Sequence, residues 1–270
     1  MRRVAFYALL ALAGATFLYP FLWMAATSFK SPAEVGGLSL LPDQPTLDNY
    51  RLMWARAPFG RALLNSLLVA TSITASVLVF GSAAAYAMAR LQFPGRGVLN
   101  AATVAILMVP GQLTLIPTYT LIVQLGWIDS YSALVAPYAF NATAILILRQ
   151  FFLQIPRSLI DCARLDGMGE LRILFTVIWP LATPALAMVG IFTFMGAWNE
   201  VLWPLLVVRD EQLMTLPQLL TVFSLGGGAG PRQLGTKLAA AMVLVVPVVA
   251  AYAFLQRFFI ESMASTGSKG

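Results

Sequence analysis

Long apolar stretches separated by short charged segments dominate the sequence. Seven stretches of at least 18 residues contain no Asp, Glu, Lys or Arg. A helix needs about 20 apolar residues to cross the roughly 30 Å hydrocarbon core of a bilayer. The stretch 212–231 contains two prolines and a run of three glycines, which would leave backbone groups unsatisfied in lipid, so it predicts an extramembrane loop.

The other six stretches predict an all-α polytopic membrane protein, a single domain over 1–270 with six transmembrane helices. The helices are expected near 4–26, 62–88, 99–123, 132–152, 184–207 and 238–258. The first follows Met-Arg-Arg, as a secretory signal does. However, the apolar run Val4–Ala26 is longer than a signal core and contains Pro20, which favours a retained helix. Pro110 and Pro117 make the third helix a candidate for a kink.

Composition supports the membrane assignment and removes most enzyme chemistry. Apolar residues make up 59% of the chain, charged residues only 10%, and the mean hydropathy is +0.80. The absence of histidine excludes imidazole acid-base chemistry and His-containing metal sites. The single Cys162 excludes an internal disulfide and a cysteine metal cluster. No catalytic or metal-binding residue is therefore expected.

Basic residues are unevenly distributed between the two sides of the predicted bundle. The side with both termini and the loops 90–98 and 153–183 carries ten basic and four acidic residues, a net charge of +6, whereas the other side carries seven of each. Positive charge in short loops marks the cytoplasmic side. Both termini and a tail over 259–270 are therefore expected in the cytoplasm of a prokaryote. Membrane topology accounts for the excess of basic over acidic residues, so this excess does not imply a nucleic-acid partner.

The external loop 28–61 is too long to be a simple connection. Its four prolines, Pro32, Pro42, Pro45 and Pro58, exclude one continuous helix. The segment DNYRLMW within it predicts a short amphipathic helical turn on the membrane surface. This pattern fits a loop that closes the outer mouth of the path, a loop that contacts an external partner, or a tether packed on neighbouring helices. Trp127, Trp198 and Trp203 are expected to anchor at the membrane interface.

The loop 153–183 predicts a helix-turn-helix elbow beneath the bilayer. Pro156 suits a helix start, so a helix is expected over 157–165, with Gly167 adopting the φ > 0 conformation of a helix end. Asp166 is expected to cap a second segment over 170–179 that stops at Pro180. The small Cys162 and Ala163 would fit a groove on another protein. A docking elbow and an amphipathic surface connector both account for this pattern.

The stretch DCARLDGMGELRILFTVIWP resembles the EAA loop of inner-membrane permeases of binding-protein-dependent ABC importers. Asp161, Cys162 and Ala163 stand at the EAA positions, Asp166 and Gly167 at the DG positions, Met168 at the final Ala, and Pro180 at the closing proline. Asp keeps the carboxylate of Glu and Cys remains small, whereas Met is larger than the usual Ala. Segments such as TSFKSPAEV, MVPGQLTLIPTY, WNEVLWPLLVV and LQRFFIESMASTGSKG are similar to the carbohydrate branch, in particular the second permease subunit of maltose-type and glycerol-phosphate-type importers.

The resemblance implies a set of partners and a mechanism. A second homologous permease, two copies of a cytoplasmic ATP-binding subunit and an extracytoplasmic solute-binding protein would complete the importer. The elbow residues would couple this chain to an ATPase, which would bind the ATP and magnesium. In agreement, the sequence contains no GxxxxGK[ST] phosphate loop and no cofactor is expected in this chain.

Polar residues within the apolar helices are candidates for the solute path, because a sugar needs amides, hydroxyls and aromatic faces. The candidates are Asn65, Gln112, Asn141, Asn199 and Glu200. For the amides, interhelical hydrogen bonding is the alternative. Glu200 is an acidic group near the outer end of the fifth helix, where it lines the path, reaches water or pairs with a neighbour.

Two other classes of protein fit the sequence less well. A stand-alone secondary transporter would need a coupling site of buried acids, and Glu200 is the only candidate. An intramembrane hydrolase would need a nucleophile with a base, and histidine is absent. An importer permease therefore accounts for the sequence best, with the identity of the solute left open.

Overall fold

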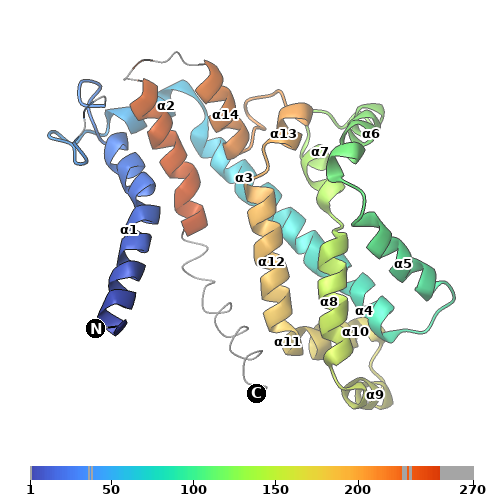
Figure 1. The fold of residues 1–270 in the computed structure, drawn as a ribbon. Coiled ribbons are helices and arrows are strands. Elements are labelled where there is room, and N and C mark those ends of the chain that lie inside the picture. The colour runs from blue at the N-terminus through green and yellow to red at the C-terminus, as the bar shows by residue number, and fades with distance from the viewer. Residues whose placement is uncertain (1, 36, 38, 227–229, 231–232, 250–270) are drawn as a thin grey trace.

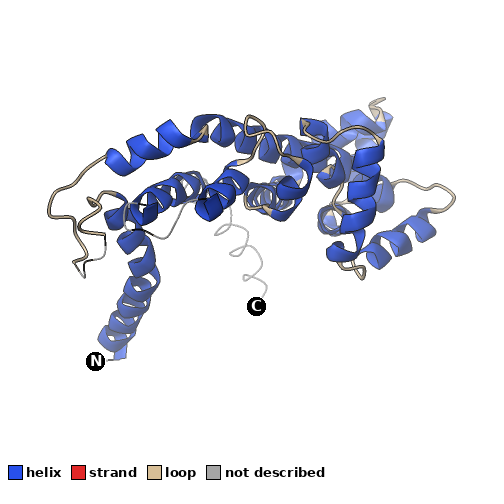
Figure 2. Cartoon of the chain, turned by 90° about the horizontal axis from the view of Figure 1, so that it is seen from above, coloured by secondary structure: helices blue, strands red, loops and turns tan. Residues whose placement is uncertain are grey.

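The computed structural model describes residues 2–35, 37, 39–226, 230 and 233–249. All of the regular elements in these ranges are helices, joined by loops (Figures 1 and 2). The all-α prediction is therefore confirmed. The expected tail over 259–270 and the last residues of the expected helix 238–258 lie outside the described ranges.

Two helices are long and apolar enough to cross a membrane. The first is α1 (Arg2–Ser28), which stands apart from the other helices in Figure 1 and buries none of its apolar window. The second is continuous over Phe59–Arg90 and consists of α3 (Phe59–Ser76), the π-helical segment η1 (Val77–Gly81) and α4 (Ser82–Arg90). The exposed surface of α1 is suited to lipid or a partner subunit, because water would not solvate it.

Three further apolar segments are helix pairs with a sharp bend. The first pair, α5 (Arg96–Ile106) and α6 (Gly111–Gln124), is bent by 103°. The second, bent by 44°, joins α7 (Tyr131–Val135) and the 3-10 turn η2 (Ala136–Tyr138) to α8 (Ala142–Gln154). If each pair counts as one span, the described residues contain up to five spans. The count of six is therefore still a prediction.

The third pair, bent by 90°, forms the second arm of the elbow and the helix that follows it. The arm contains α10 (Glu170–Ile173), the π-helical segment η3 (Leu174–Ile178) and α11 (Trp179–Leu181), and the helix is α12 (Thr183–Trp198). The helical arm continues past Pro180 to Leu181, two residues beyond the predicted stop. Since the arm lies perpendicular to α12, it is suited to run along the membrane surface.

The structure corrects the predicted helix bounds in four places, one of which is the 44° bend within the helix expected over 132–152. The single helix expected over 99–123 is broken at Pro110, which precedes α6 in an extended conformation without a donor N–H. The helix expected over 184–207 stops at Trp198 and resumes as α13 (Leu202–Val207). The loop expected over 212–231 contains a helix, α14 (Leu216–Gly226), which packs on α3 but at 11 residues is too short to span.

The core forms where α3, α4, α8 and α12 pack together. α4 packs along α8, and α12 packs against both α3 and α8. Small buried residues, Ala85 and Ala89 on α4 and Ala144 on α8, let these backbones approach closely. Trp198 and Trp203 are also almost completely buried, so the prediction that they anchor at the membrane interface is wrong.

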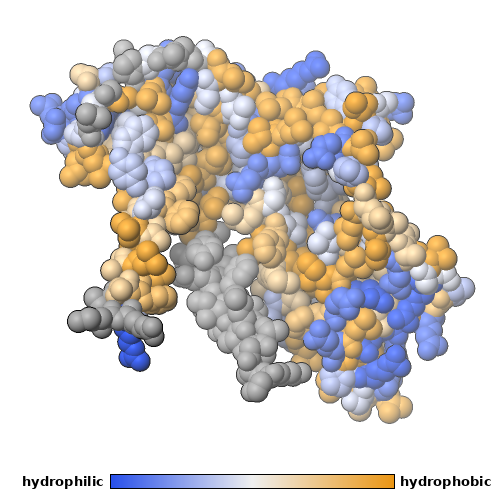
Figure 3. All heavy atoms as spheres, in the orientation of Figure 1, coloured by the Kyte–Doolittle hydropathy of each residue, from blue (hydrophilic) through white to orange (hydrophobic). Residues whose placement is uncertain are grey.

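The segment between α1 and α3 contains the predicted short helix, α2 (Asp48–Arg56). The loop before it is folded, because the Asn49 amide donates to the carbonyl oxygens of Ser28 and Lys30 at 3.0 and 2.8 Å. In Figure 3, apolar side chains cover much of the middle of the molecule, and hydrophilic ones gather near α9 (Arg157–Leu165), at the end that also holds the N-terminus. The last described helix runs over Gln233–Val249.

Candidate functional site

The elbow begins with α9, whose bounds match the sequence prediction. Its C-terminus carries both hydrogen bonds of a Schellman motif: the Gly167 N–H donates to Arg164 O, and the Met168 N–H donates to Ala163 O, each at 3.0 Å. Gly167 has φ +78°, a conformation that side chains with a Cβ resist. The predicted turn at Gly167 is therefore confirmed.

Met168 and Asp166 have different roles from those expected. The Met168 side chain is half-buried and packs against the core, as a hydrophobic residue at this position of a Schellman motif commonly does. Its size is therefore accommodated within the chain. Asp166 ends α9, whereas the residue preceding α10 is Gly169 and caps without a side-chain hydrogen bond. The prediction that Asp166 caps the second segment is wrong.

The two faces of α9 differ sharply. Ile160 and Ala163 are buried at 2% and 5% exposure. Asp161, Cys162 and Leu165 are exposed, and Leu165 reaches 88%. Ala163 therefore packs within this chain and does not form part of the surface offered to a partner, in contrast to the expectation from its size. Cys162, as expected, is on the outward face.

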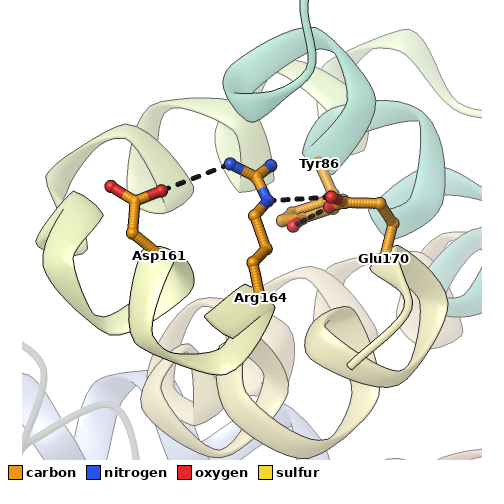
Figure 4. Close-up of polar contacts among 4 residues, drawn as sticks. All are labelled: Tyr86, Asp161, Arg164 and Glu170. Carbon is orange, nitrogen blue, oxygen red and sulfur yellow. Dashed lines mark hydrogen bonds and ion pairs between the residues drawn. The ribbon is translucent and has the colours of Figure 1, made fainter. Parts of the chain in front are cut away.

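Arg164 and Glu170 join the two arms of the elbow to α4 (Figure 4). Arg164 donates from Nε to Glu170 Oε1 at 2.9 Å, and its Nη1 lies 3.3 Å from Asp161 Oδ1. The other Glu170 oxygen accepts a 2.6 Å hydrogen bond from the Tyr86 hydroxyl. The hydrogen bond from Arg164 holds the pKa of the Glu170 carboxyl below its ordinary value, despite partial burial. Glu170 is therefore an ionised bridge between α4, α9 and α10.

A second contact attaches the elbow to the same helix, one turn away. The Trp179 indole N–H donates to the Ser82 hydroxyl oxygen at 3.0 Å. Ser82 and Tyr86 are four residues apart, so both point from one face of α4. Sequence reasoning missed Tyr86, Ser82, Glu170 and Trp179. No local pattern pairs them, since their partners lie 84 and 97 residues away.

At the opposite end of the molecule from α9, two adjoining cavities lie where helices are broken. The first has a volume of about 250 Å³ and is lined by residues of α3, α7, η2, α12 and α13 and of the loops that precede α8, α13 and α14. The second, of about 300 Å³, is lined by the start of α6 together with η2 and α13. Tyr138, Glu200 and Trp203 line both cavities. Glu200 lies in the gap between α12 and α13, and Asn141 immediately precedes α8.

The structure brings three of the five predicted path residues to these cavities. Glu200 lines both, Asn141 lines the first and Gln112 lines the second. Glu200 Oε1 also accepts a 3.0 Å hydrogen bond from the Trp203 N–H, and Asn141 Oδ1 accepts one from the Ala144 N–H. These two side chains therefore combine helix capping with a place in a cavity wall.

Asn65 and Asn199 belong to neither cavity. The Asn65 amide donates to Gln212 O and Met214 O at 2.8 and 3.0 Å, and its Oδ1 accepts from the Tyr131 hydroxyl at 2.7 Å. Asn65 therefore holds the loop after α13 and the start of α7 against α3, as the interhelical alternative required. Asn199 donates to Met195 O of its own helix at 2.8 Å and is exposed.

Comparison with known proteins gives this architecture a family. Residues 77–265, which include the elbow and all of the residues lining the second cavity, match the binding-protein-dependent transport system inner membrane component. The chain belongs to this family. It is an ABC importer permease and an inner-membrane component. Importers of this family in general combine a permease with a partner permease, an ATPase and a solute-binding protein.

The permease is similar over nearly its whole length to characterised transport permeases. It is 31% identical to the sn-glycerol-3-phosphate transport system permease protein UgpE of Escherichia coli K12, with 96% of this chain and 95% of UgpE covered. It is 32% identical to the arabinooligosaccharides transport system permease protein AraQ of Halalkalibacterium halodurans, with 94% and 91% covered.

A solved structure shares the permease fold. It is the crystal structure of a bacterial ABC transporter involved in the import of the acidic polysaccharide alginate, with a TM-score of 0.86, 24% identity and 95% of both chains covered. At this identity the match supports the arrangement of the helices and is silent on the solute.

Proposed function

We propose that this permease moves a sugar or sugar-like solute across the cytoplasmic membrane and that its α9–α10 elbow docks on an ATPase subunit. Asp161, Cys162 and Asp166 would form the docking surface, whereas Ala163, Gly167 and Met168 would hold its shape. The full importer would contain this chain, a second permease, two ATPase copies and an external binding protein. We also propose that the chain crosses the membrane six times and has both termini in the cytoplasm. The names of the two relatives and the pair of cavities support the solute class.

The exposed face of α9 is the observation that carries the docking proposal. Leu165 is 88% exposed between Asp161 and Asp166, whose carboxylates are also exposed. An amphipathic connector lying on lipid would bring its apolar residues to one side and basic residues to the headgroups. Here the apolar tip lies between two acids, and the neighbouring basic residue, Arg164, is already paired with Asp161 and Glu170. This arrangement suits a protein groove with basic residues at its rim.

The attachment of α9 also favours a coupling role. Two hydrogen bonds, Tyr86 to Glu170 and Trp179 to Ser82, connect the elbow to a helix that continues as far as Phe59. A movement of α9 against an ATPase would therefore be transmitted to a rigid rod that crosses the bilayer. A loosely attached connector would dissipate such a movement.

Native Cys162 provides the test, because it is exposed on the docking face and is the only cysteine of the chain. A membrane-impermeant maleimide should not label it in intact cells but should label it in inside-out vesicles stripped of ATPase. Re-adding the ATPase subunits should slow the labelling at least tenfold. The control is Gly97→Cys in a Cys162→Ser chain, since Gly97 is exposed at the start of α5 and does not belong to the elbow. Its labelling in inside-out vesicles should be unaffected by the ATPase.

Two outcomes would reject the proposal. Labelling of Cys162 from outside intact cells would show that α9 faces the outside, so the proposed topology would be wrong. Equal labelling rates with and without the ATPase, with Gly97→Cys behaving as expected, would show that α9 is not the docking surface.

A further inference from the structure

The two cavities at the helix breaks carry an inference about the solute, which rests on the proposed function. Each is close to the lower end of the roughly 300–1,000 Å³ range of small-molecule sites. Three helix breaks, before α6, before α8 and before α13, meet around them. Non-helical backbone at membrane depth is tolerated where it lines a cavity, and discontinuous helices commonly build solute sites in transporters.

The walls combine aromatic faces with separate polar groups. Tyr138, Phe140, Phe192 and Trp203 line the first cavity, together with Asn141, Glu200 and Thr215. Tyr138 and Trp203 are in edge-to-face contact, with ring centroids 6.5 Å apart. Alternating aromatic and hydrogen-bonding groups suit a sugar ring, which presents C–H faces and hydroxyl edges.

Thr215 provides an independent observation that points to a ligand. It is 4% exposed and lines the first cavity, and its Oγ1 has no hydrogen-bond partner within the described part of the chain. A buried hydroxyl without a partner costs free energy, so such groups in native structures usually have a bound partner. The oxygen itself is sealed from the cavity, so a rotation of the Thr215 side chain on binding would bring it to a hydroxyl group of the solute.

The charge of the walls discriminates between solutes. Glu200 is the one charged residue among those lining the two cavities in the described ranges, and Lys and Arg are absent from both walls there. One Glu200 oxygen caps α13 at Trp203, and the carboxylate retains further acceptor capacity for sugar hydroxyls. An anionic solute would instead meet a like charge without a compensating cation, which weakens binding at least about tenfold in a partly buried site.

We propose that these cavities form a subsite for one uncharged saccharide unit, in which Glu200 accepts hydrogen bonds from the sugar hydroxyls and the Thr215 hydroxyl donates to or accepts from them. This subunit then contacts the solute directly and selects neutral sugars over phosphorylated or uronic ones. The two named relatives illustrate that both kinds of solute occur in the family, since one transports glycerol 3-phosphate and the other arabino-oligosaccharides.

The test uses the complete importer in nanodiscs without its binding protein, titrated separately with neutral and anionic probes. The neutral probes are arabinotriose, maltotriose and cellotriose, and the anionic ones are trigalacturonate and glycerol 3-phosphate. Tryptophan fluorescence reports binding, because Trp203 lines both cavities. At least one neutral trisaccharide should bind saturably, and neither anion should.

Three variants separate a solute contact from a structural role. Glu200→Gln keeps an acceptor for the Trp203 N–H but removes the charge, so it should weaken neutral binding about tenfold and improve anion binding. Thr215→Val should also weaken neutral binding several-fold, since its hydroxyl stabilises nothing else in the described chain. The control is Thr71→Val, at an exposed position of α3 whose hydroxyl bonds to Leu67 O of its own helix. It should bind as the wild type does.

The results also distinguish this inference from the proposed function. ATP-driven uptake of any saccharide by the importer with its binding protein supports the proposed function. The subsite is rejected if, in the same preparation, no neutral probe binds, an anion binds as tightly as the best neutral probe, or both variants bind like the wild type. Absence of saccharide uptake would reject the proposed function and the subsite together.

Discussion

Tyr86 donates a 2.6 Å hydrogen bond from its hydroxyl to Oε2 of Glu170, 84 residues later in the chain. Tyr86 is 3% exposed on α4, and Glu170 begins the second arm of the elbow. Because Arg164 occupies the other Glu170 oxygen, one carboxylate holds both arms of the elbow to a long helix (Figure 4). This contact places the proposed docking surface in mechanical continuity with the bilayer-crossing part of the permease.

Removing the Tyr86 hydroxyl should weaken that continuity. Tyr86→Phe should lower the free energy of unfolding by about 1.5 kcal/mol, near the low end for a hydrogen bond to a charged group, because Glu170 is partly exposed. Uptake per ATP hydrolysed should fall at least twofold. Thermal unfolding of the detergent-solubilised importer and uptake by proteoliposomes measure the two effects.

The matched control for this variant is Tyr119→Phe, on α6, where the structure gives the hydroxyl no hydrogen bond among the described residues. A double-mutant cycle of Tyr86→Phe with Glu170→Gln should give a coupling energy of about 1 kcal/mol. Additive effects in that cycle, with unchanged uptake per ATP, would contradict a coupling role for the contact.

Gly167 should tolerate only residues that accept a positive φ. Gly167→Val should distort the turn between α9 and α10 at a cost of about 1–3 kcal/mol, because a β-branched residue resists φ +78°. No neighbouring atom lies within 4 Å of the position that a Cβ would occupy, so the strain is in the backbone alone. Membrane insertion should therefore survive, whereas co-purification of the ATPase should be lost.

Gly167→Asn is the control, since Asn adopts the left-handed region far more readily than Val. It should retain most of the ATPase in a pull-down. Full recovery of ATPase and normal uptake with Gly167→Val would show that the geometry of this turn is not required.

The hydrogen bonds that join the loop at Asp129 to the loop at Arg209 and Asp210 should persist down to acidic pH. Asp129, at φ +55°, accepts hydrogen bonds through Oδ1 from the N–H groups of Arg209 and Asp210 at 2.5 and 3.0 Å. The bond from the Arg209 backbone and then that from Asp210 hold the pKa of the Asp129 carboxyl below its ordinary value. Because the folded-state pKa of Asp129 lies below the ordinary value, the hydrogen-bonded carboxylate stabilises the folded state above about pH 4. This stabilisation is lost as the pH falls through the folded-state pKa.

Hydrogen exchange measures this contact. Asp129→Ala should speed exchange of the Arg209 and Asp210 amides about fivefold at pH 7, equivalent to about 1 kcal/mol after allowance for solvent access. Asp129→Asn keeps an acceptor and tolerates the positive φ, so it should show a smaller change. In the wild type the protection should be constant from pH 7 to pH 5. A loss of protection already at pH 5 would contradict the lowered pKa.

Local sequence patterns determined the helical class and the elbow turn. Charge-free apolar runs of at least 18 residues are longer than a barrel strand needs, and a helix satisfies all of their backbone hydrogen bonds within the segment. Pro156 and Gly167 act on their own backbone angles, and α9 accordingly begins and ends where the sequence predicted. Such effects depend on neighbours in the chain and can be derived without tertiary contacts.

Tertiary structure decided which residues work together. Asn65 and Glu200 are both polar residues in apolar surroundings. Asn65 uses its hydrogen bonds in joining loops to α3, whereas Glu200 lines two cavities. The pairing of Tyr86 with Glu170 likewise joins residues that are 84 positions apart in the chain. Hydropathy reports how much apolar surface a segment has, but tertiary contacts decide which polar groups pair with one another and which one meets a cavity.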